Sequence, residues 1–274
     1  MKTVKRILSY TGLIFLALFL TGPFIWMIFV AFKSSGNVFK IADLKDFLPF
    51  PATFSNFIQV MKDVPLIPQF LLNTIWICFW GVFLELLIAS LAAYPLARLE
   101  FPGRNFIFAA MLATLMLPAQ ANMIVNFITI RKLGLFDTYL SIFLPSLVSV
   151  FGIFLMRQAY IVIPRELEDA ARIDGCGELG IWYRIMLPLT RPSMATLAIF
   201  SFVSYWNTFM WPLVILKHEA KYPLAVGLSY LSNMFASNFR AVAAGSVLSM
   251  VPIIIVFVIM QRHFIKGIMA GSIK

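Results

Sequence analysis

The sequence contains little charge. Asp, Glu, Lys and Arg make up 12% of its 274 residues, which is about half the share usual in a soluble domain. Hydrophobic residues make up 61%, and the mean hydropathy is +0.90. A soluble core of this size has too little interior to hide so much apolar surface. The composition therefore predicts an integral membrane protein.

The chain is also poor in metal-ligating and redox-active residues, with two cysteines and two histidines. Cys78 lies in an apolar run, Cys176 lies in a polar segment, and no Cys-x-x-Cys pair occurs. His218 and His263 are far apart in the sequence. We therefore predict two unpaired thiols and no metal site.

Signatures of several other function classes are missing. No Gly-x-x-x-x-Gly-Lys-Ser/Thr phosphate loop is present, so the chain is not expected to bind ATP itself. A multi-span membrane enzyme would need paired carboxylates or a His motif near the interface, and a secondary carrier would usually show two related halves. The sequence shows none of these features. Its net charge of +10 is better explained by basic residues beside membrane spans than by nucleic-acid binding.

Six segments are long and apolar enough to cross a membrane as helices. They are residues 11–32, 70–97, 105–129, 139–160, 194–216 and 242–261. The first follows three basic residues, so a cleaved signal peptide is the alternative for it. Its long apolar run and the lack of a small-x-small cleavage site favour a retained span.

The distribution of Lys and Arg predicts that both termini face the cytoplasm. In this orientation the inner segments carry 13 basic residues over 67 positions, and the outer segments carry 9 over 71. The excess of Lys and Arg in the inner segments is modest, and its direction agrees with the positive-inside rule. The outer segment 217–241 would then either dock a partner or pack as a loop over the helix ends.

Residues 164–188 form a charged segment between apolar runs. Pro164 suits the first turn of a helix, where its missing N–H would be unbonded anyway. Acidic residues in the following turns complement the helix dipole, and Glu168 and Arg172 stand at i,i+4. Gly175 is expected to end this helix in a left-handed conformation.

A second short helix is expected after this turn. Its apolar residues share one face; they are Ile181, Trp182, Ile185 and Met186. Pro188 is expected to end it, because the residue before a proline is pushed out of helical geometry. The pattern predicts a helix-turn-helix knob, and an amphipathic connector on the lipid surface is the alternative.

The spacing of Asp169-Ala170-Ala171, Gly175 and Ile185-x-Leu187-Pro188 resembles the EAA loop of importer-type ABC transporter permeases, with Asp169 in place of the usual Glu. The resemblance implies that a cytoplasmic ATPase docks on this loop. The residues implied to couple the ATPase to the permease are Glu168, Asp169, Ala170, Ala171, Arg172, Asp174, Gly175, Ile185, Leu187 and Pro188.

Further motifs resemble carbohydrate permeases, and the resemblance extends from about residue 10 to the C-terminus. They lie in residues 93–104, 133–139, 151–158, 206–213 and 267–274. Together they point to the MalG-like permease subunits of di- and oligosaccharide importers. The resemblance implies an all-α, six-helix type I importer permease fold. Residues 1–274 would form one transmembrane domain with a core at about 70–262 and a peripheral first span.

The same resemblance implies an assembly in a prokaryotic plasma membrane. Its other members would be cytoplasmic ABC ATPase subunits that bind ATP and Mg²⁺, a second and different permease, and an extracytoplasmic sugar-binding protein. The chain itself would be a transport subunit, with no enzyme activity and no cofactor. The tail Gly267–Lys274 is expected at the ATPase interface. Val125 and Glu85 depart from the family pattern.

Polar residues inside membrane spans are costly and tend to face the interior of the helix bundle. Pro118 and the polar residues after it predict a third span that is broken and polar on one side. The candidate translocation-pathway residues are Glu85, Gln120, Asn122, Tyr205, Trp206, Asn207 and Trp211. The alternatives are structural pairing for Glu85, hydrogen bonding between helices for the third span, and interfacial anchoring for the tryptophans.

Overall fold

The computed structural model describes residues 2–34, 38, 47–234 and 238–270. Within these ranges the regular structure is helical, and one isolated bridge joins Lys33 and Ala52. The chain forms two compact units. The first consists of Met1–Pro68 with Gly227–Pro252, and the second of Gln69–Val226 with Ile253–Lys274.

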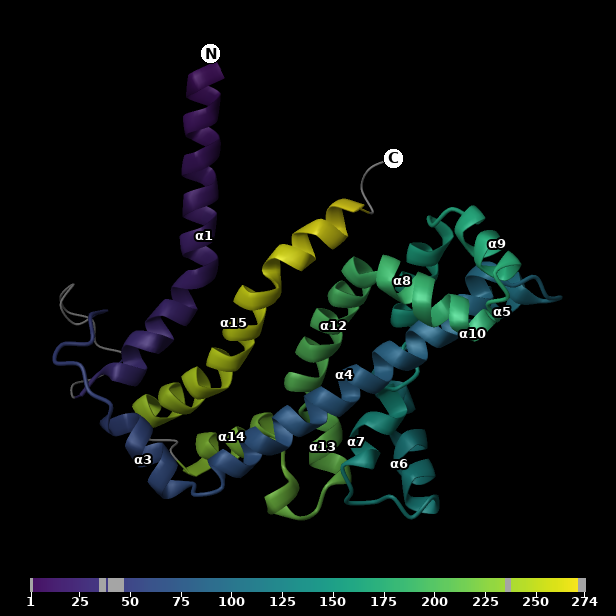
Figure 1. Ribbon diagram of the computed structural model, residues 1–274. Helices are drawn as coiled ribbons and strands as arrows, with labels where there is room; N and C mark the ends of the chain where they lie inside the picture. The colour runs from purple at the N-terminus through teal and green to yellow at the C-terminus, as the bar shows by residue number, and fades with distance from the viewer. Residues whose placement is uncertain (1, 35–37, 39–46, 235–237, 271–274) are drawn as a thin grey trace. The chain divides into compact units, whose positions relative to one another are not determined.

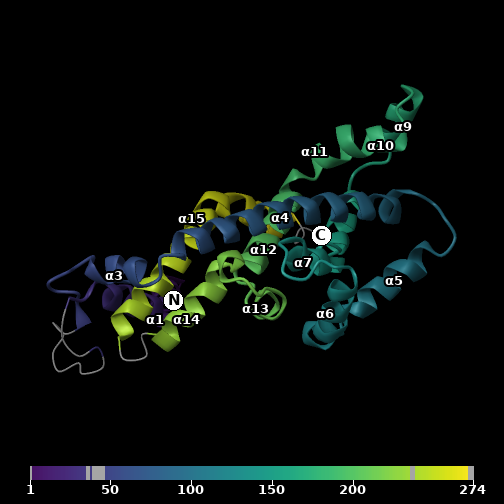
Figure 2. The ribbon, with the colours of Figure 1, turned by 90° about the horizontal axis from the view of Figure 1, so that it is seen from below.

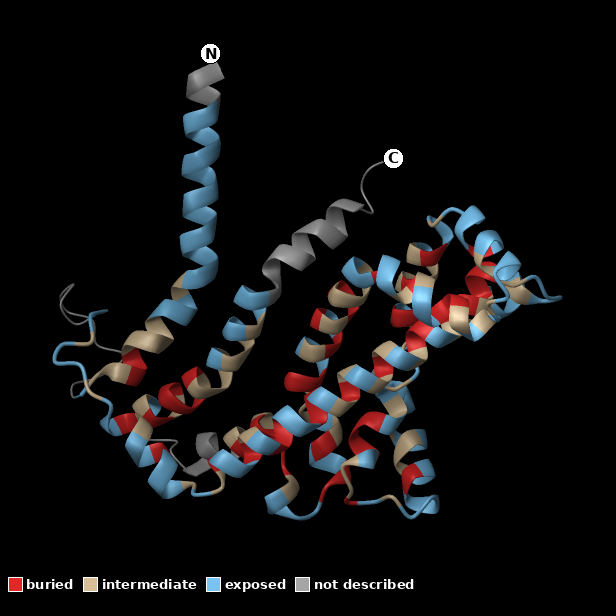
Figure 3. Ribbon diagram, in the orientation of Figure 1, coloured by how far each residue is buried: buried red, intermediate tan, exposed pale blue. Residues whose placement is uncertain are grey.

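In the first unit, α3 (Ser55–Asp63) is attached to the end of α1 (Lys2–Phe32). The side-chain amide of Asn56 donates to the carbonyl of Ala31 at 2.8 Å and to that of Lys33 at 3.0 Å. Most of the described side chains of α1 are exposed (Figure 3). A helix that is apolar on all sides and not covered by protein is suited to a lipid environment.

The second unit is built on α4 (Ile67–Arg98), which α8 (Val150–Ile161) and α12 (Arg191–Trp206) contact (Figure 1). Small residues allow this close packing. A Cβ added to Gly152 of α8 would lie 3.1 Å from the Cβ of Ala89 in α4 and 3.2 Å from a methyl group of Leu197 in α12. The buried core around this contact consists of Ala89, Ala93, Tyr94, Leu96, Ala97, Ile153, Met156, Tyr160, Ile181, Trp182, Met186 and Leu197.

The other helices are mostly short. They are α5 (Arg104–Thr114), η1 (Ala119–Asn122), α6 (Met123–Lys132), α7 (Leu140–Phe143), η2 (Leu144–Ser146), α9 (Glu166–Ile173), α10 (Glu178–Ile181), η3 (Trp182–Met186), α11 (Leu187–Leu189), α13 (Met210–Ile215), η4 (Glu219–Lys221), α14 (Leu224–Met234) and α15 (Phe239–Ala270). In the second unit, α9 and α10 lie by the C-terminal half of α4 (Figure 2).

Three described helices are long and apolar enough to cross a membrane. They are Arg6–Phe32 of α1, the whole of α4, and Phe239–Ile259 of α15. Two bent pairs, Leu140–Ser146 with Val150–Ile161 and Glu178–Leu189 with Arg191–Trp206, raise the number to as many as five. The chain is therefore a multi-pass membrane protein.

Of the six segments expected to cross the membrane, the third, 105–129, does not form a helix or bent helix pair that is long and apolar enough to do so. It consists of α5 and α6 separated by residues 115–122. Pro118 lies in this interruption with extended backbone. Its missing N–H cannot continue a helix, so the break predicted at Pro118 is confirmed. The fifth segment is interrupted as well, because α12 ends at Trp206 and α13 begins at Met210.

Candidate functional site

The coupling loop, residues 164–188, has the predicted helix and turn at its start. The helix α9 ends at Ile173 with Asp174 as its C-cap, and Gly175 follows with a φ of +78°. The N–H of Gly175 donates to the carbonyl of Arg172 at 3.0 Å, and that of Cys176 donates to Ala171 at 2.9 Å. This pair of bonds is a Schellman motif, which caps the last carbonyls of a helix. The prediction that Gly175 ends this helix in a left-handed conformation is confirmed.

The loop is attached to α4 through a buried ion pair. The guanidinium of Arg98, in the last turn of α4, contacts the carboxylate of Glu168 at 2.8 Å. Glu168 is 2% exposed and Arg98 is 8% exposed. Arg98 also donates to the carbonyl of Ile163, just before α9. Burial raises the pKa of Glu168, although the guanidinium groups of Arg98 and Arg172 oppose the rise.

A second connection joins α9, α10 and α4. Arg172 contacts Glu168 at 3.5 Å, as predicted, and its Nε also donates to Glu178 at 3.0 Å. The Tyr94 hydroxyl of α4 donates to the same carboxylate of Glu178. These hydrogen bonds from Arg172 and Tyr94 lower the pKa of Glu178, despite a smaller opposing effect of burial. The two helices of the loop are thus fixed to each other and to α4.

The second half of the loop differs from the prediction at Pro188. A π-helical turn, η3, precedes it, and helical backbone continues through Pro188 to Leu189. A π turn bonds i to i+5, so a helix that contains one can accommodate a residue without an N–H. The chain instead turns at Thr190, where the two halves of the bent pair meet at 80°. The prediction that Pro188 ends this helix was wrong.

The ten residues proposed for coupling divide by exposure. The exposed members are Asp169, Ala170, Arg172, Asp174, Gly175 and Pro188. Ala171, Ile185 and Leu187 are half-buried and pack against the core. Glu168, which was expected to form part of the ATPase docking knob, is buried, because Arg98 pairs with it from inside the protein. Within this chain Glu168 anchors the loop.

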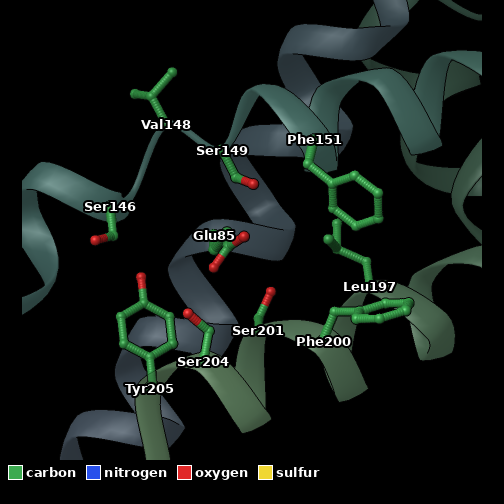
Figure 4. A pocket seen from close by; sticks show the side chains of 10 residues that line it. All are labelled: Glu85, Ser146, Val148, Ser149, Phe151, Leu197, Phe200, Ser201, Ser204 and Tyr205. Carbon is green, nitrogen blue, oxygen red and sulfur yellow. The ribbon is translucent and has the colours of Figure 1, made fainter. Parts of the chain in front are cut away.

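The first polar cavity lies between α4, the start of α8, and α12, and has a volume of about 520 Å³. Figure 4 shows the carboxyl of Glu85 pointing into it, with the hydroxyls of Ser149, Ser201 and Tyr205 around it. The remaining lining residues are Ser146, Val148, Phe151, Leu197, Phe200 and Ser204. The Tyr205 ring lies against α4 at Gly81, where an added Cβ would come within 2.8 Å of it.

The second polar cavity, of about 440 Å³, shares Ser146, Ser204 and Tyr205 with the first. In this cavity the polar side chains expected along the broken third span lie together with residues that follow α12. Its other lining residues are Gln120, Asn122, Met123, Asn126, Ile142, Pro145, Thr208, Phe209, Met210 and Trp211. The indole N–H of Trp211 donates to the carbonyl of Ser141 at 2.8 Å, which fixes the ring in the cavity wall.

Five of the seven candidate pathway residues therefore line these cavities. Trp206 does not; it is buried, and its ring packs on Phe202 with centroids 5.4 Å apart. Asn207 does not either, because its amide donates to the carbonyl of Val203 at 2.8 Å and caps the end of α12. Local sequence could not separate these two from Tyr205, since all three are neighbours at a helix end.

On the side of the second unit away from the coupling loop, Asp137 organises two loops. It accepts hydrogen bonds from the backbone N–H of Lys217 at 2.9 Å and from Lys221 Nζ at 2.7 Å, and it contacts the His218 ring. Asn73 of α4 donates to the carbonyls of Ala220 and Tyr222. Residues 217–222 thus pack as a loop over helix ends, and the docking of a partner on 217–241 stays a prediction.

Sequence reasoning missed four residues that organise these sites: Tyr94, Arg98, Asp137 and Glu178. Arg98 carried a signal, because a cation in the last turn of a long apolar helix needs a partner when it is buried. Asp137 follows Gly134 in a turn and has a φ of +59°, which Asp tolerates better than most residues. The tail Gly267–Lys274 stays a prediction, since its side chains lie outside the described residues.

Comparison with known proteins agrees with this arrangement. Residues 85–269 match the family described as the binding-protein-dependent transport system inner membrane component. The chain belongs to this family, whose members are permease subunits of importers rather than enzymes.

Individual relatives match over nearly the full chain. The arabinooligosaccharides transport system permease protein AraQ of Halalkalibacterium halodurans is 38% identical over 263 residues, which is 96% of this chain and 94% of the relative. The lactose transport system permease protein LacG of Rhizobium radiobacter is 33% identical and is covered completely, as is this chain. A chain from the crystal structure of a bacterial ABC transporter that imports the acidic polysaccharide alginate superposes with a TM-score of 0.83 at 29% identity, covering 96% of this chain and 97% of that one.

Proposed function

We propose that this chain is one of two permease subunits in an ATP-driven importer for a di- or oligosaccharide. The relatives are named for arabinooligosaccharides, lactose and diacetylchitobiose, which share a carbohydrate backbone and little else. The polar cavities suit this cargo, because hydroxyl, amide and aromatic groups line them together. A permease for a non-sugar solute is the competing proposal.

The proposed topology has six spans with both termini in the cytoplasm. The broken helices would then supply spans three to five, with α1, α4 and α15 as the continuous ones. Non-helical backbone at membrane depth is tolerated where it lines a cavity or is buried in protein. The interruptions after α5 and α12 fit this rule, because Gln120, Asn122 and Thr208 at these breaks all line the second cavity.

The coupling loop would be the attachment point of a cytoplasmic ATPase that carries ATP and Mg²⁺. The observation that supports this most is the attachment of α9 and α10 to the end of α4 by Arg98–Glu168 and by Tyr94–Glu178–Arg172. A force applied to the loop would reach α4 through one buried ion pair and one partly exposed hydrogen-bonded network, in addition to the chain connection. The same helix carries Glu85 into the first cavity. ATP-driven closure would thereby shift the balance between two packing states of the spans.

Uptake of a panel of radiolabelled sugars by cells with and without this chain tests the cargo. Uptake of at least one neutral di- or oligosaccharide is expected to depend on the chain, and co-purification is expected to recover ATPase subunits and a second permease in fixed proportion. Recovery of the ATPase without uptake of any sugar would favour the non-sugar alternative. Absence of a stoichiometric ATPase would refute the importer assembly.

A further inference from the structure

The first polar cavity contains a buried acid with an unusual set of neighbours. Glu85 is 7% exposed, and it lies in the apolar helix α4, where the family resemblance requires no acid. A buried carboxyl is retained when hydrogen-bond partners offset its desolvation. In the described part of the chain no cation forms an ion pair with Glu85, so its partners must be neutral groups.

Those neutral groups are hydroxyls with protons to donate. Ser201 is 3% exposed and Tyr205 is 5% exposed, and both hydroxyls lie beside the carboxyl of Glu85 (Figure 4). The Ser149 hydroxyl accepts from the N–H of Gly152 at 3.1 Å, which leaves its own proton free. The carboxyl and the hydroxyls together present hydrogen-bond acceptors and donors to a ligand in the cavity.

The wall across the cavity from Ser146 and Tyr205 is aromatic (Figure 4). The rings of Phe151 and Phe200 meet edge to face, with centroids 5.5 Å apart, and Leu197 lies beside them (Figure 4). A sugar ring has an apolar C–H face and a rim of hydroxyls. Such a ring fits between an aromatic wall and a polar wall better than a purely apolar or purely ionic solute would. A cavity of about 520 Å³ is within the usual range for small-molecule sites, about 300–1,000 Å³.

We propose that this cavity is a sugar subsite within this subunit, and that it takes a neutral ring and rejects one that carries a carboxylate. The inference rests on the proposed carbohydrate transport. Sugar hydroxyls would donate to Glu85 and accept from Ser201 and Tyr205, while Phe151 and Phe200 pack on the C–H face. A second carboxylate beside an ionised Glu85 would meet like charge, and no Lys or Arg is among the described lining residues to offset it.

The second cavity extends the subsite to a longer cargo. Ser146, Ser204 and Tyr205 line both spaces, so one sugar ring could sit in each with the linkage beside Tyr205. Gln120 and Asn122 supply amides in the second space, and Trp211 supplies an aromatic surface. The amides are neutral, and among the described residues that line the two cavities Glu85 is the one acid. Glu85 would therefore set the charge selectivity.

Protection of an introduced thiol tests the subsite in the complete, purified importer. Ser204 is exposed to both cavities, so Ser204→Cys is placed in a background in which Cys78→Ala and Cys176→Ser remove the native free thiols. The rate of labelling by a small neutral thiol reagent is measured with two added sugars. One is the sugar with the highest uptake in the panel above, and the other is its counterpart with a uronic acid in place of one ring CH₂OH.

The neutral sugar is expected to slow labelling of Ser204→Cys several-fold, and the uronic acid is expected to have little effect. In Glu85→Gln, which keeps the shape and removes the charge, the uronic acid should protect at a concentration roughly tenfold lower than before, since like-charge repulsion is gone. Lys132→Cys, at the exposed end of α6, is the control and should label at the same rate with either sugar.

The outcomes separate this inference from the proposed function. If no sugar is taken up through the importer, the proposed function fails and the subsite fails with it. If uptake occurs but the transported sugar leaves the labelling of Ser204→Cys unchanged, the subsite alone is wrong. Equal protection by both sugars with Glu85 present, or a uronic acid as the best substrate in the panel, would overturn the charge selectivity.

Discussion

At the residue scale, Arg98 shows how a charge can be kept in an apolar helix. The Arg98 side chain is buried, and the distance from its Nε to the carboxylate of Glu168 is 2.8 Å. Taking two charges out of water is expensive, and removing one partner leaves the other buried and uncompensated. We therefore assign the pair mainly to positioning the coupling loop, rather than to increasing the net stability of the protein.

We expect Arg98→Ala to lower the stability of the purified importer by about 3–5 kcal/mol, because the buried Glu168 then keeps only its longer, 3.5 Å contact with the partly exposed Arg172. The measurement is the thermal unfolding midpoint in detergent. Arg98→Met with Glu168→Gln removes both charges and should recover most of the loss. If the double variant is less stable than Arg98→Ala alone, the buried pair is not the cause.

Asp137 gives a prediction for pH. Burial by itself would raise its pKa, but hydrogen bonds from Lys221, His218 and the backbone at Lys217 and His218 hold it well below its ordinary value of 3.8. The folded state thus binds this proton less readily than the unfolded state. The stability that Asp137 contributes is complete above the unfolded pKa and is lost as pH falls through the folded one.

Asp137→Asn keeps the side-chain shape and tolerates the positive φ, so it should remove mainly the charge. The variant is expected to unfold at a lower temperature than the parent near neutral pH, and the gap should close as the pH is brought below 3.8. Glu219→Gln, which removes an exposed acid from the same loop, is the control and should shift the midpoint little. A gap that stays constant into acid would contradict the assignment.

At the scale of single elements, the end of α9 depends on one backbone conformation. Gly175 has a φ of +78°, and an added Cβ would meet no atom within 4 Å. Any effect of Gly175→Ala therefore comes from the left-handed backbone, which costs a residue with a Cβ about 1–2 kcal/mol. Asn tolerates this region better, so Gly175→Asn should lie between the parent and Gly175→Ala.

Coupling measurements on the same residue separate conformation from docking. Gly175→Ala is expected to lower sugar uptake per ATP hydrolysed, because the loop would lose its fixed turn. Gly175→Arg should reduce that ratio further, since it also adds bulk to the exposed surface, while the chain still inserts in the membrane. Normal uptake by Gly175→Arg would mean that this surface does not touch the ATPase.

The helices of this loop show how far local sequence reaches. The α9 helix, its i,i+4 pair and its glycine turn follow from residues within a few positions of one another, and all were predicted. The burial of Glu168 was not, because its partner Arg98 lies 70 positions earlier. The helix through Pro188 was not predicted either, since the local rule for proline ignores the π turn before it.

At the scale of the whole molecule, hydropathy predicted the class and the approximate positions of the spans. Hydropathy alone does not show where the spans break; Pro118 predicted the break in the third span, and the break after Trp206 was not predicted. Breaks at 115–122 and 207–209 place polar backbone next to Gln120, Asn122 and Thr208, and such breaks follow from Pro118 and from tertiary contacts together. The two cavities were likewise beyond the sequence, because each combines residues from distant segments.

The exposed surface of the coupling loop yields the last prediction. Ile173 is 86% exposed and Leu179 is 72% exposed. Both are large apolar side chains close to the charged residues that join α9, α10 and α4. Apolar residues of this kind, gathered on one projecting element, are typical of a surface that a partner covers. We therefore expect Ile173→Glu to leave membrane insertion and the Arg98–Glu168 contact intact, and to reduce the amount of ATPase that co-purifies by tenfold or more, since a charge would be buried at the contact.

Leu133→Glu, which changes an exposed leucine at the other end of the unit near Asp137, is the matched control and should retain the ATPase. If Ile173→Glu retains as much ATPase as Leu133→Glu does, the ATPase binds elsewhere on the chain. The contacts that join α9 to α4 would then have another function.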